Sequence, residues 1–285
     1  MAQIGIGALI DTAWEDYRKH FANNIRITAW LGVFVLLHII AISFYPIGAE
    51  EIDRALSGSE WFGVGLFLIN TLIILPIISI WMVNALIARI DADARGKALS
   101  MHKLATESWR LFLPQLWVRI LVGVAFVVAF AIPFALLWLT SQVLSGTLPF
   151  LVSLLFMFVA LLLFLIPLVL MVYLAFVFFA LVLDKKHGVL ALKESMARVK
   201  QGVWGVAWRL IVPKLLYFGV LLVVQYVLLM ILGMLVSAMA SGGDALLAVR
   251  LDWILQPTLY VLLTILVYPI VFITDYRIYQ SFPTT

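Results

Sequence analysis

The sequence predicts an all-α polytopic membrane protein with six transmembrane helices. Two observations support this fold class. Hydrophobic residues make up 65% of the 285 residues and charged residues only 12%, and the mean hydropathy is +1.14. A soluble globule cannot cover that much apolar surface. In addition, long segments contain no Asp, Glu, Lys or Arg, and these are 27–49, 61–88, 120–183, 215–243 and 253–274.

Each of these segments is long enough to cross a bilayer as a helix, since about 20 helical residues span its hydrocarbon core. Segment 120–183 is too long for one span and is expected to hold two helices. Small and polar residues mark the turn between them, namely Ser141, Gln142, Ser145, Gly146 and Thr147. The expected number of spans is therefore six. A transmembrane β-barrel is excluded because its strands alternate in polarity, whereas these segments are continuously apolar.

Three short basic stretches, centred on Trp14, Trp109 and Met196, each precede a pair of apolar segments. Their apolar residues recur at helical spacings of three and four. These stripes are Ile10, Trp14, Tyr17 and Phe21; Met101, Ala105, Trp109 and Phe112; and Val189, Leu192, Met196, Val199 and Val203. The stretches are too short and too charged to span a membrane. We expect three amphipathic helices that lie in the cytoplasmic interface, with their basic residues near anionic headgroups.

The spacing of the three stretches, 95 and then 87 residues, indicates an internal triplication of helix, span and span. The second and third copies align Glu107 with Glu194, Ser108 with Ser195, and Trp117 with Trp204. The prediction is a single integral membrane domain, 1–285, with repeats at about 1–90, 91–183 and 184–285. The alternative is that basic amphipathic connections are common to all polytopic proteins.

The basic residues predict the orientation of the chain. On the predicted topology, 17 of the 19 Lys and Arg residues fall on one side, and only Arg54 and Arg250 lie opposite. The positive-inside rule makes the basic side cytoplasmic, so both termini are expected in the cytoplasm. A nucleic-acid partner is not expected, because no segment is long enough to form a folded basic domain. The expected partners are membrane lipids with anionic headgroups.

No motif in the sequence predicts catalysis, a metal site or a cofactor. Cysteine is absent, and the four histidines form no pair with the spacing of zinc ligands. No nucleophile elbow or phosphate-binding loop is present. We therefore expect a protein without enzymatic activity and with no metal or cofactor. The alternative of a cryptic membrane enzyme stays open, and it requires a pocket with paired titratable groups.

The strongest polar candidates at membrane depth are His38 in the first span, Asn70 in the second and Gln225 in the fifth. Polar groups in hydrocarbon tend to face other helices. They either line a route for a solute or form hydrogen bonds with neighbouring helices. No Asp, Glu, Lys or Arg lies deep within a span, which disfavours ion-coupled transport.

Several short motifs resemble the six-helix membrane domain of glycerophosphodiester phosphodiesterases and related bacterial inner-membrane proteins. They are Asp93, Gly96 and Lys97 leading to Glu107-Ser108-Trp109; Gly188-Val189 leading to Ala191-Leu192-Lys193-Glu194-Ser195; and Asp275-Tyr276-Arg277. The resemblance covers nearly the whole chain and implies a multi-pass protein of the bacterial cytoplasmic membrane. Active members of that family carry catalysis on a separate soluble domain. That domain is not expected here, so the resemblance assigns no catalytic residue.

Two functional hypotheses follow from these observations. In the first, the protein is non-enzymatic and organises or docks lipids or partner proteins at the cytoplasmic membrane face. The candidate docking residues are Trp14, Trp109, Met196 and Arg198. In the alternative, it is a permease for a small or lipidic solute, whose route is lined by His38, Asn70 and Gln225.

Overall fold

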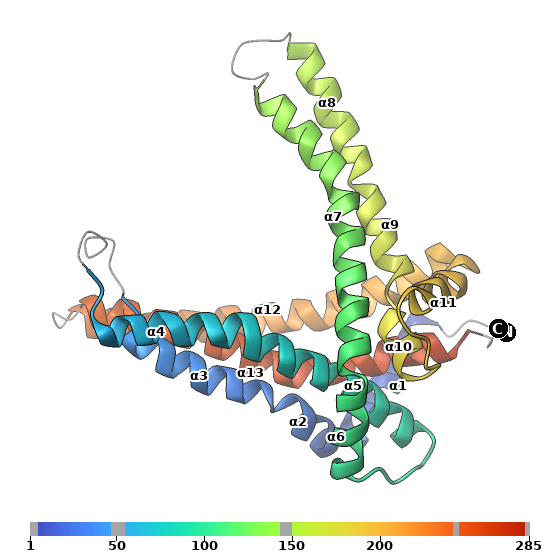
Figure 1. The fold of residues 1–285 in the computed structure, drawn as a ribbon, viewed down its shortest axis with the longest axis horizontal. Coiled ribbons are helices and arrows are strands. Elements are labelled where there is room, and N and C mark those ends of the chain that lie inside the picture. Colours follow the sequence, from blue (N-terminus) through green and yellow to red (C-terminus); the bar gives the residue numbers. More distant parts are fainter. Residues whose placement is uncertain (1–4, 47–54, 143–149, 242–244, 283–285) are drawn as a thin grey trace. The chain divides into compact units, whose positions relative to one another are not determined.

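The computed structural model describes residues 5–46, 55–142, 150–241 and 245–282, and every regular element in these ranges is a helix (Figure 1). Six helical segments are long and apolar enough to cross a membrane. They are Phe21–Phe44, Gly58–Ala94, Phe112–Thr140, Leu154–Val182, Val203–Met239 and Leu246–Gln280. The prediction of an all-α polytopic protein with six spans is confirmed.

The described chain packs as two compact units. Unit 1 comprises Met1–Trp109 and Ile211–Ser281, and unit 2 comprises Arg110–Leu210 and Phe282–Thr285. The division does not follow the predicted repeat boundaries, because unit 1 combines the first repeat with most of the third. The single domain made of three repeats stays a prediction.

Unit 1 is a bundle in which α13 contacts α1, α2, α3 and α5. Its elements are α1 (Ile6–Lys19), α2 (Phe21–Thr28), α3 (Leu31–Phe44), α4 (Gly58–Ile69), η2 (Asn70–Ile74), α5 (Leu75–Ala94), α6 (Met101–Arg110), the part of α12 (Val203–Ser241) from Ile211 onward, and α13 (Ala245–Gln280). In Figure 1, α3 lies beside both α4 and α13, in agreement with their contacts. The centre of the bundle is the middle of α5, where residues 80–87 are all buried.

The second span of unit 1 is continuous from α4 through η2 to α5. It begins with a capping box, in which the Ser57 side chain accepts from the Glu60 amide and the Glu60 carboxylate accepts from the Ser57 amide. The π-helical turn η2 lies just before Pro76, which has no N–H and crowds the preceding turn. A π-turn is one of the usual ways in which a helix accommodates such a break.

Unit 2 is built on a helical hairpin in which α7 packs against α8 and α9 (Figure 1). Its elements are α7 (Phe112–Gln142), α8 (Phe150–Leu163), α9 (Leu165–Tyr173), α10 (Val177–Val182), α11 (Val189–Lys200) and the first turns of α12. Of the residues predicted to form the turn between the two spans, Ser141 and Gln142 end α7. Ser145, Gly146 and Thr147 lie outside the described residues.

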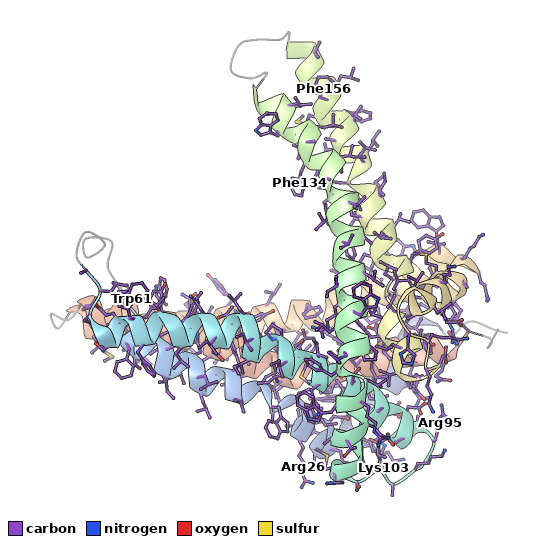
Figure 2. The ribbon with its side chains drawn as sticks, in the orientation of Figure 1. Arg26, Trp61, Arg95, Lys103, Phe134 and Phe156 are labelled. Carbon is purple, nitrogen blue, oxygen red and sulfur yellow. The ribbon has the colours of Figure 1, made fainter. Side chains whose placement is uncertain are left out.

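Large apolar side chains project outward from helices in both units. Figure 2 shows Trp61 on α4 and Phe134 on α7, which are 63% and 57% exposed. In water this exposure would be costly. It is the surface expected of helices whose surroundings are lipid chains.

The three basic stretches form α1, α6 and α11, and each has a buried inner face in addition to the predicted apolar stripe. The buried residues are Leu9, Ala13 and Tyr17 in α1, Leu104 and Ser108 in α6, and Ala191, Ser195, Arg198 and Val199 in α11. Small residues recur on these faces because they let a helix approach its neighbours closely. Much of the predicted apolar stripe remains outside, with Trp14 49% and Trp109 52% exposed.

The inner faces occupy equivalent positions in the three helices. When Trp14, Trp109 and Met196 are aligned, Leu9 matches Leu104 and Ala191, and Ala13 matches Ser108 and Ser195. All six of these matched residues are almost fully buried. An internal repeat predicts this equivalence, because duplicated helices retain the face that packs.

Gly63 on α4 lies against the backbone at the end of α3. A Cβ atom at Gly63 would lie 2.5 Å from the carbonyl carbon of Phe44, whereas nothing lies within 4 Å of one at Gly65. We expect Gly63→Ala to force α3 and α4 apart and to cost about 1–3 kcal/mol of stability. Gly65→Ala is the matched control, because it carries the same gain in helix propensity without the clash. Thermal unfolding in detergent measures both variants, and equal melting temperatures would contradict the close contact.

Candidate functional site

The strongest concentration of polar contacts lies where the C-terminal ends of α5 and α13 meet α1. We call this region the polar end of unit 1. Tyr276 donates its hydroxyl hydrogen to Asp91 Oδ1 on α5 at 3.0 Å. Arg277 donates from Nε and Nη2 to Asp16 Oδ2 on α1, at 2.8 and 2.5 Å. Two consecutive residues of α13 therefore hold two different helices.

A third consecutive residue, Asp275, ties α13 to α12. Its Oδ2 lies 2.9 Å from the Lys214 ammonium, and the neighbouring Thr274 and Tyr217 hydroxyls are 3.3 Å apart. Asp275 is buried, and a buried carboxylate needs a charged partner. Successive residues of an α-helix point about 100° apart, so three in a row reach three different neighbours.

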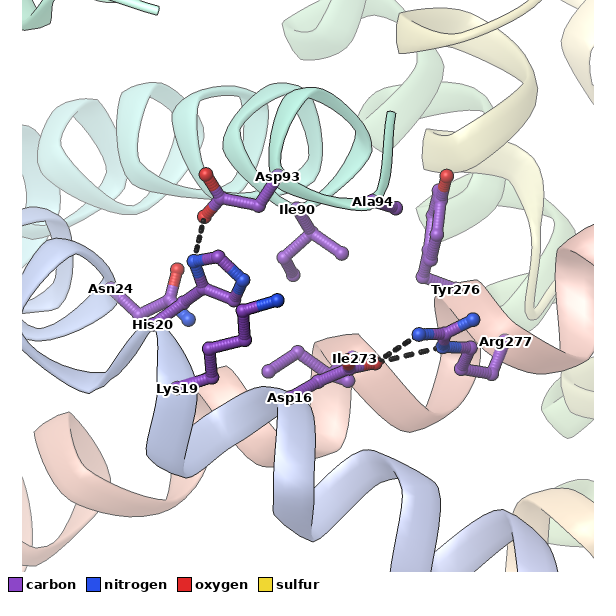
Figure 3. Close-up of a pocket in the computed structure, with 10 residues that line it drawn as sticks. All are labelled: Asp16, Lys19, His20, Asn24, Ile90, Asp93, Ala94, Ile273, Tyr276 and Arg277. Atoms are coloured by element: carbon purple, nitrogen blue, oxygen red, sulfur yellow. Dashed lines mark hydrogen bonds and ion pairs between the residues drawn. The ribbon is translucent and has the colours of Figure 1, made fainter. Parts of the chain in front are cut away.

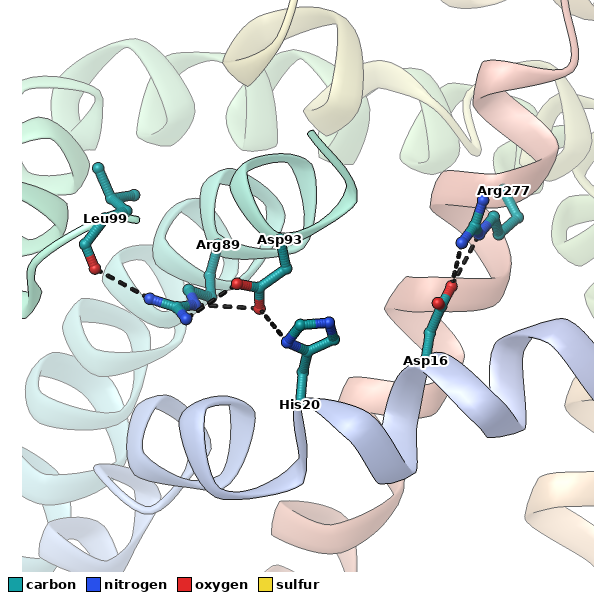
Figure 4. Close-up of polar contacts among 6 residues, drawn as sticks. All are labelled: Asp16, His20, Arg89, Asp93, Leu99 and Arg277. Atoms are coloured by element: carbon teal, nitrogen blue, oxygen red, sulfur yellow. Dashed lines mark hydrogen bonds and ion pairs between the residues drawn. The ribbon is translucent and has the colours of Figure 1, made fainter. Parts of the chain in front are cut away.

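His20 and Arg89 complete the polar end by sharing one carboxylate, Asp93 (Figure 4). His20 Nδ1 lies 3.3 Å from Asp93 Oδ2, and Arg89 Nε donates to the same oxygen at 3.0 Å. Arg89 also donates to the Leu99 carbonyl at 2.9 Å, beyond the end of α5. The junction of α1 and α2 is thereby linked to α5 and to the segment that leads into α6.

Tyr17 fastens α1 to the middle of α13. Its hydroxyl donates to the Leu266 carbonyl at 3.0 Å, and burial raises the pKa of Tyr17. The hydroxyl therefore stays protonated and keeps its hydrogen for this bond. The inner face of α1 is fixed by this bond as well as by Asp16.

A pocket of about 160 Å³ opens among these groups (Figure 3). Its polar lining residues are Asp16, Lys19, His20, Asn24, Asp93, Tyr276 and Arg277. Asn24 is almost fully buried, and its Oδ1 has no hydrogen-bond partner. The Lys19 ammonium has no acidic partner among the described residues. The pocket therefore combines a cation, the Lys19 ammonium, with an unpaired acceptor, Asn24 Oδ1. It suits a small group that is anionic at one end and donates a hydrogen bond at the other.

In the described ranges, no group of three His, Asp or Glu side chains is placed to hold a metal ion. The predictions of no metal, no cofactor and no enzymatic activity stay predictions.

Two of the candidate docking residues lie in unit 2, on α11. Arg198 is buried, and it donates to Asp184 Oδ2 at 2.6 Å and to Glu194 Oε1 at 2.9 Å. Met196 is partly buried and packs against the core of this unit. Arg198 thus forms an internal anchor of α11, in contrast with the exposed side chains of Trp14 and Trp109.

Ser195 holds α11 against the junction of α9 and α10. Its hydroxyl donates to the Tyr173 carbonyl at 2.7 Å and accepts from the Phe176 amide at 3.2 Å. Both backbone groups lie at the break between α9 and α10, where the helical bonding is interrupted. The aligned serine of α6, Ser108, is also buried, and its carbonyl accepts from the Asn84 amide at 3.2 Å.

The three polar residues predicted within the spans do not share a single described cavity. Asn70 donates to the Phe34 carbonyl at 3.0 Å, which is a contact between adjacent helices. His38 lies against the Trp253 carbonyl and lines a separate cavity of unit 1. Gln225 is partly buried on α12 and does not line that cavity. A solute route through all three stays a prediction.

Sequence reasoning missed the polar end as a site, although it singled out Asp275-Tyr276-Arg277 and Asp93 for their resemblance to a family. The sequence signal that could have identified this site is the run of polar residues, Asp275 to Arg277, directly after the apolar segment 253–274. Their partners on other helices lie far away in the sequence, 185 positions for Asp91 and 261 for Asp16, so no local pattern connects them.

Comparison with known proteins finds no matching family model, no matching curated protein and no matching solved structure. The relation to the membrane domain of glycerophosphodiester phosphodiesterases therefore stays a prediction from the motifs.

Replacing Arg277 tests whether the polar end holds α1 in place. We expect Arg277→Gln to cost about 1 kcal/mol of stability, since its pair with Asp16 is partly exposed, and to speed hydrogen exchange in α1. Arg95→Gln is the matched control, because Arg95 pairs with Asp91 four residues away on its own helix. Hydrogen exchange of the two variants in detergent is the measurement. Equal exchange in α1 would show that Arg277 does not anchor it.

Proposed function

We propose that the protein is a non-enzymatic multi-pass protein of a bacterial cytoplasmic membrane, with both termini in the cytoplasm. Its function is to dock anionic lipids at the cytoplasmic face, through amphipathic helices that lie in the membrane interface. Docked lipids would in turn organise partner proteins at the same face.

The two-faced packing of α1 and α6 is the observation that supports this proposal most directly. Each buries small and apolar residues against the bundle and leaves a tryptophan, Trp14 or Trp109, about half exposed on the other side. An exposed tryptophan on a short charged helix is typical of the headgroup level of a membrane.

Exposed basic residues lie on the same helices as these tryptophans. Arg18 and Lys19 follow Trp14 on α1, and Lys103 lies on α6. Each basic residue near an anionic surface contributes about 1 kcal/mol to lipid binding. The pocket beside Lys19 offers a place where a phosphate oxygen contacts the ammonium.

Replacing Lys19 tests the docking function. We expect Lys19→Gln to weaken binding of phosphatidylglycerol by about fivefold, which corresponds to about 1 kcal/mol. Lys97→Gln removes the same charge from the segment between α5 and α6, outside both helices, and serves as the control. Native mass spectrometry of the full-length protein, titrated with phosphatidylglycerol, counts the bound lipids. Equal losses in the two variants would mean that overall charge, and not α1, governs binding, and would overturn the proposal.

The orientation is tested separately, and the absence of cysteine in the chain makes the test direct. We expect Lys97→Cys to resist a membrane-impermeant maleimide in spheroplasts and to react once the membrane is broken. Ser59→Cys, in the first turn of α4 at the opposite end of the second span, is expected to react in intact spheroplasts. The reverse labelling pattern would place the termini outside the cytoplasm.

A further inference from the structure

Unit 1 contains a second cavity, formed where α3, the junction of α4 and η2, and α13 lie side by side. It has a volume of about 420 Å³. Its walls include the rings of Phe34, Phe67 and Trp253, together with the polar side chains of His38 and Asp252. None of these residues belongs to the polar end described above.

His38 presents a hydrogen-bond acceptor that has no donor. Its Nε2 lies 3.1 Å from the Trp253 carbonyl oxygen. A carbonyl only accepts, so Nε2 carries the hydrogen, and Nδ1 of the neutral ring is left with a lone pair. Nδ1 is buried without a partner, and His38 as a whole is 6% exposed. A buried acceptor of this kind is costly to leave unpaired.

Asp252 presents a negative charge that has no cation. Both of its carboxylate oxygens accept from the Gln256 amide, at 2.8 and 2.9 Å, and that amide is neutral. The nearby Arg250 donates to the Ser43 carbonyl instead. Six other acids do pair with a basic side chain: Asp16, Asp91, Asp93, Asp184, Glu194 and Asp275. Asp252 has no basic partner among the residues that the structure describes.

The aromatic walls add a third feature that favours a cation. The rings of Phe34 and Phe67 lie 5.9 and 6.0 Å from the His38 ring, centroid to centroid. Trp253 lines the same cavity. The faces of aromatic rings carry partial negative charge and attract ammonium groups, more strongly where water is excluded.

From these three features we propose that the cavity binds a ligand through an ammonium group that carries at least one N–H. The N–H donates to His38 Nδ1, the positive charge is balanced by Asp252, and the carbon next to nitrogen contacts the aromatic rings. A water molecule can donate to Nδ1, but it supplies no positive charge to balance Asp252. An anionic ligand is excluded by the same charge.

Two sources supply this chemistry: a free primary amine and the headgroup of an aminophospholipid. A quaternary ammonium group has the charge but no N–H, so it separates the hydrogen bond to His38 from simple attraction to the rings. The site is independent of the proposed docking of anionic lipids, which concerns α1 and α6.

The test uses the full-length protein in detergent, freed of bound lipid. Isothermal titration with n-butylammonium chloride is expected to show binding, with tetramethylammonium at least tenfold weaker. Asp252→Asn is expected to weaken butylammonium binding at least tenfold. Glu60→Gln is the matched control, because it removes one acidic charge from the start of α4 while glutamine keeps the capping box. His38→Leu provides a second variant, since leucine offers no acceptor to the ammonium N–H, and it is expected to weaken butylammonium binding at least tenfold.

The source of the ammonium group is resolved by native mass spectrometry after mixing the protein with phosphatidylethanolamine or phosphatidylcholine. If the protein retains phosphatidylethanolamine in preference to phosphatidylcholine, and Asp252→Asn loses this preference, the site is supported and its ligand is a lipid headgroup. Butylammonium binding without that lipid preference supports the site and identifies a free amine. The proposal is overturned if butylammonium does not bind, if tetramethylammonium binds equally well, or if Asp252→Asn and Glu60→Gln behave alike.

Discussion

The packing of unit 1 depends on one turn at the C-terminal end of α13, where Asp275, Tyr276 and Arg277 each contact a different helix. The helical rotation of about 100° per residue distributes these three side chains around the axis. The position of α1, and with it the pocket beside Lys19, therefore depends on the rotation of α13. Polar ties of this kind are worth more at a membrane interface than in water, because part of their surroundings excludes solvent.

Apolar burial acts differently in this protein from the way it acts in a soluble one. On the packed faces of α1, α6 and α11, small residues such as Ala13, Ser108 and Ser195 let the backbones approach closely, beside larger ones such as Leu9 and Leu104. The large residues Trp14 and Trp109 remain outside. That arrangement leaves α1 and α6 with an aromatic surface, which is the basis of the proposed docking to lipid.

The two cavities of unit 1 have opposite charge requirements. At the polar end the carboxylates are paired and the Lys19 ammonium is free, which favours an anionic group. In the cavity between α3 and α13 the Asp252 carboxylate lacks a cation, which favours an ammonium group. The ligands proposed for the two cavities therefore differ in charge.

The sequence by itself determined the fold class, the six spans and the positions of α1, α6 and α11, because hydropathy and helical periodicity are local properties. Only the tertiary structure decided which faces pack and which charges pair. Arg198 could be placed on a basic helix from sequence, but its burial against Asp184 and Glu194 could not. Nor could the pairing of Asp16 with Arg277, which are 261 residues apart. Such contacts depend on how whole helices are rotated and brought together, and no local pattern records that rotation.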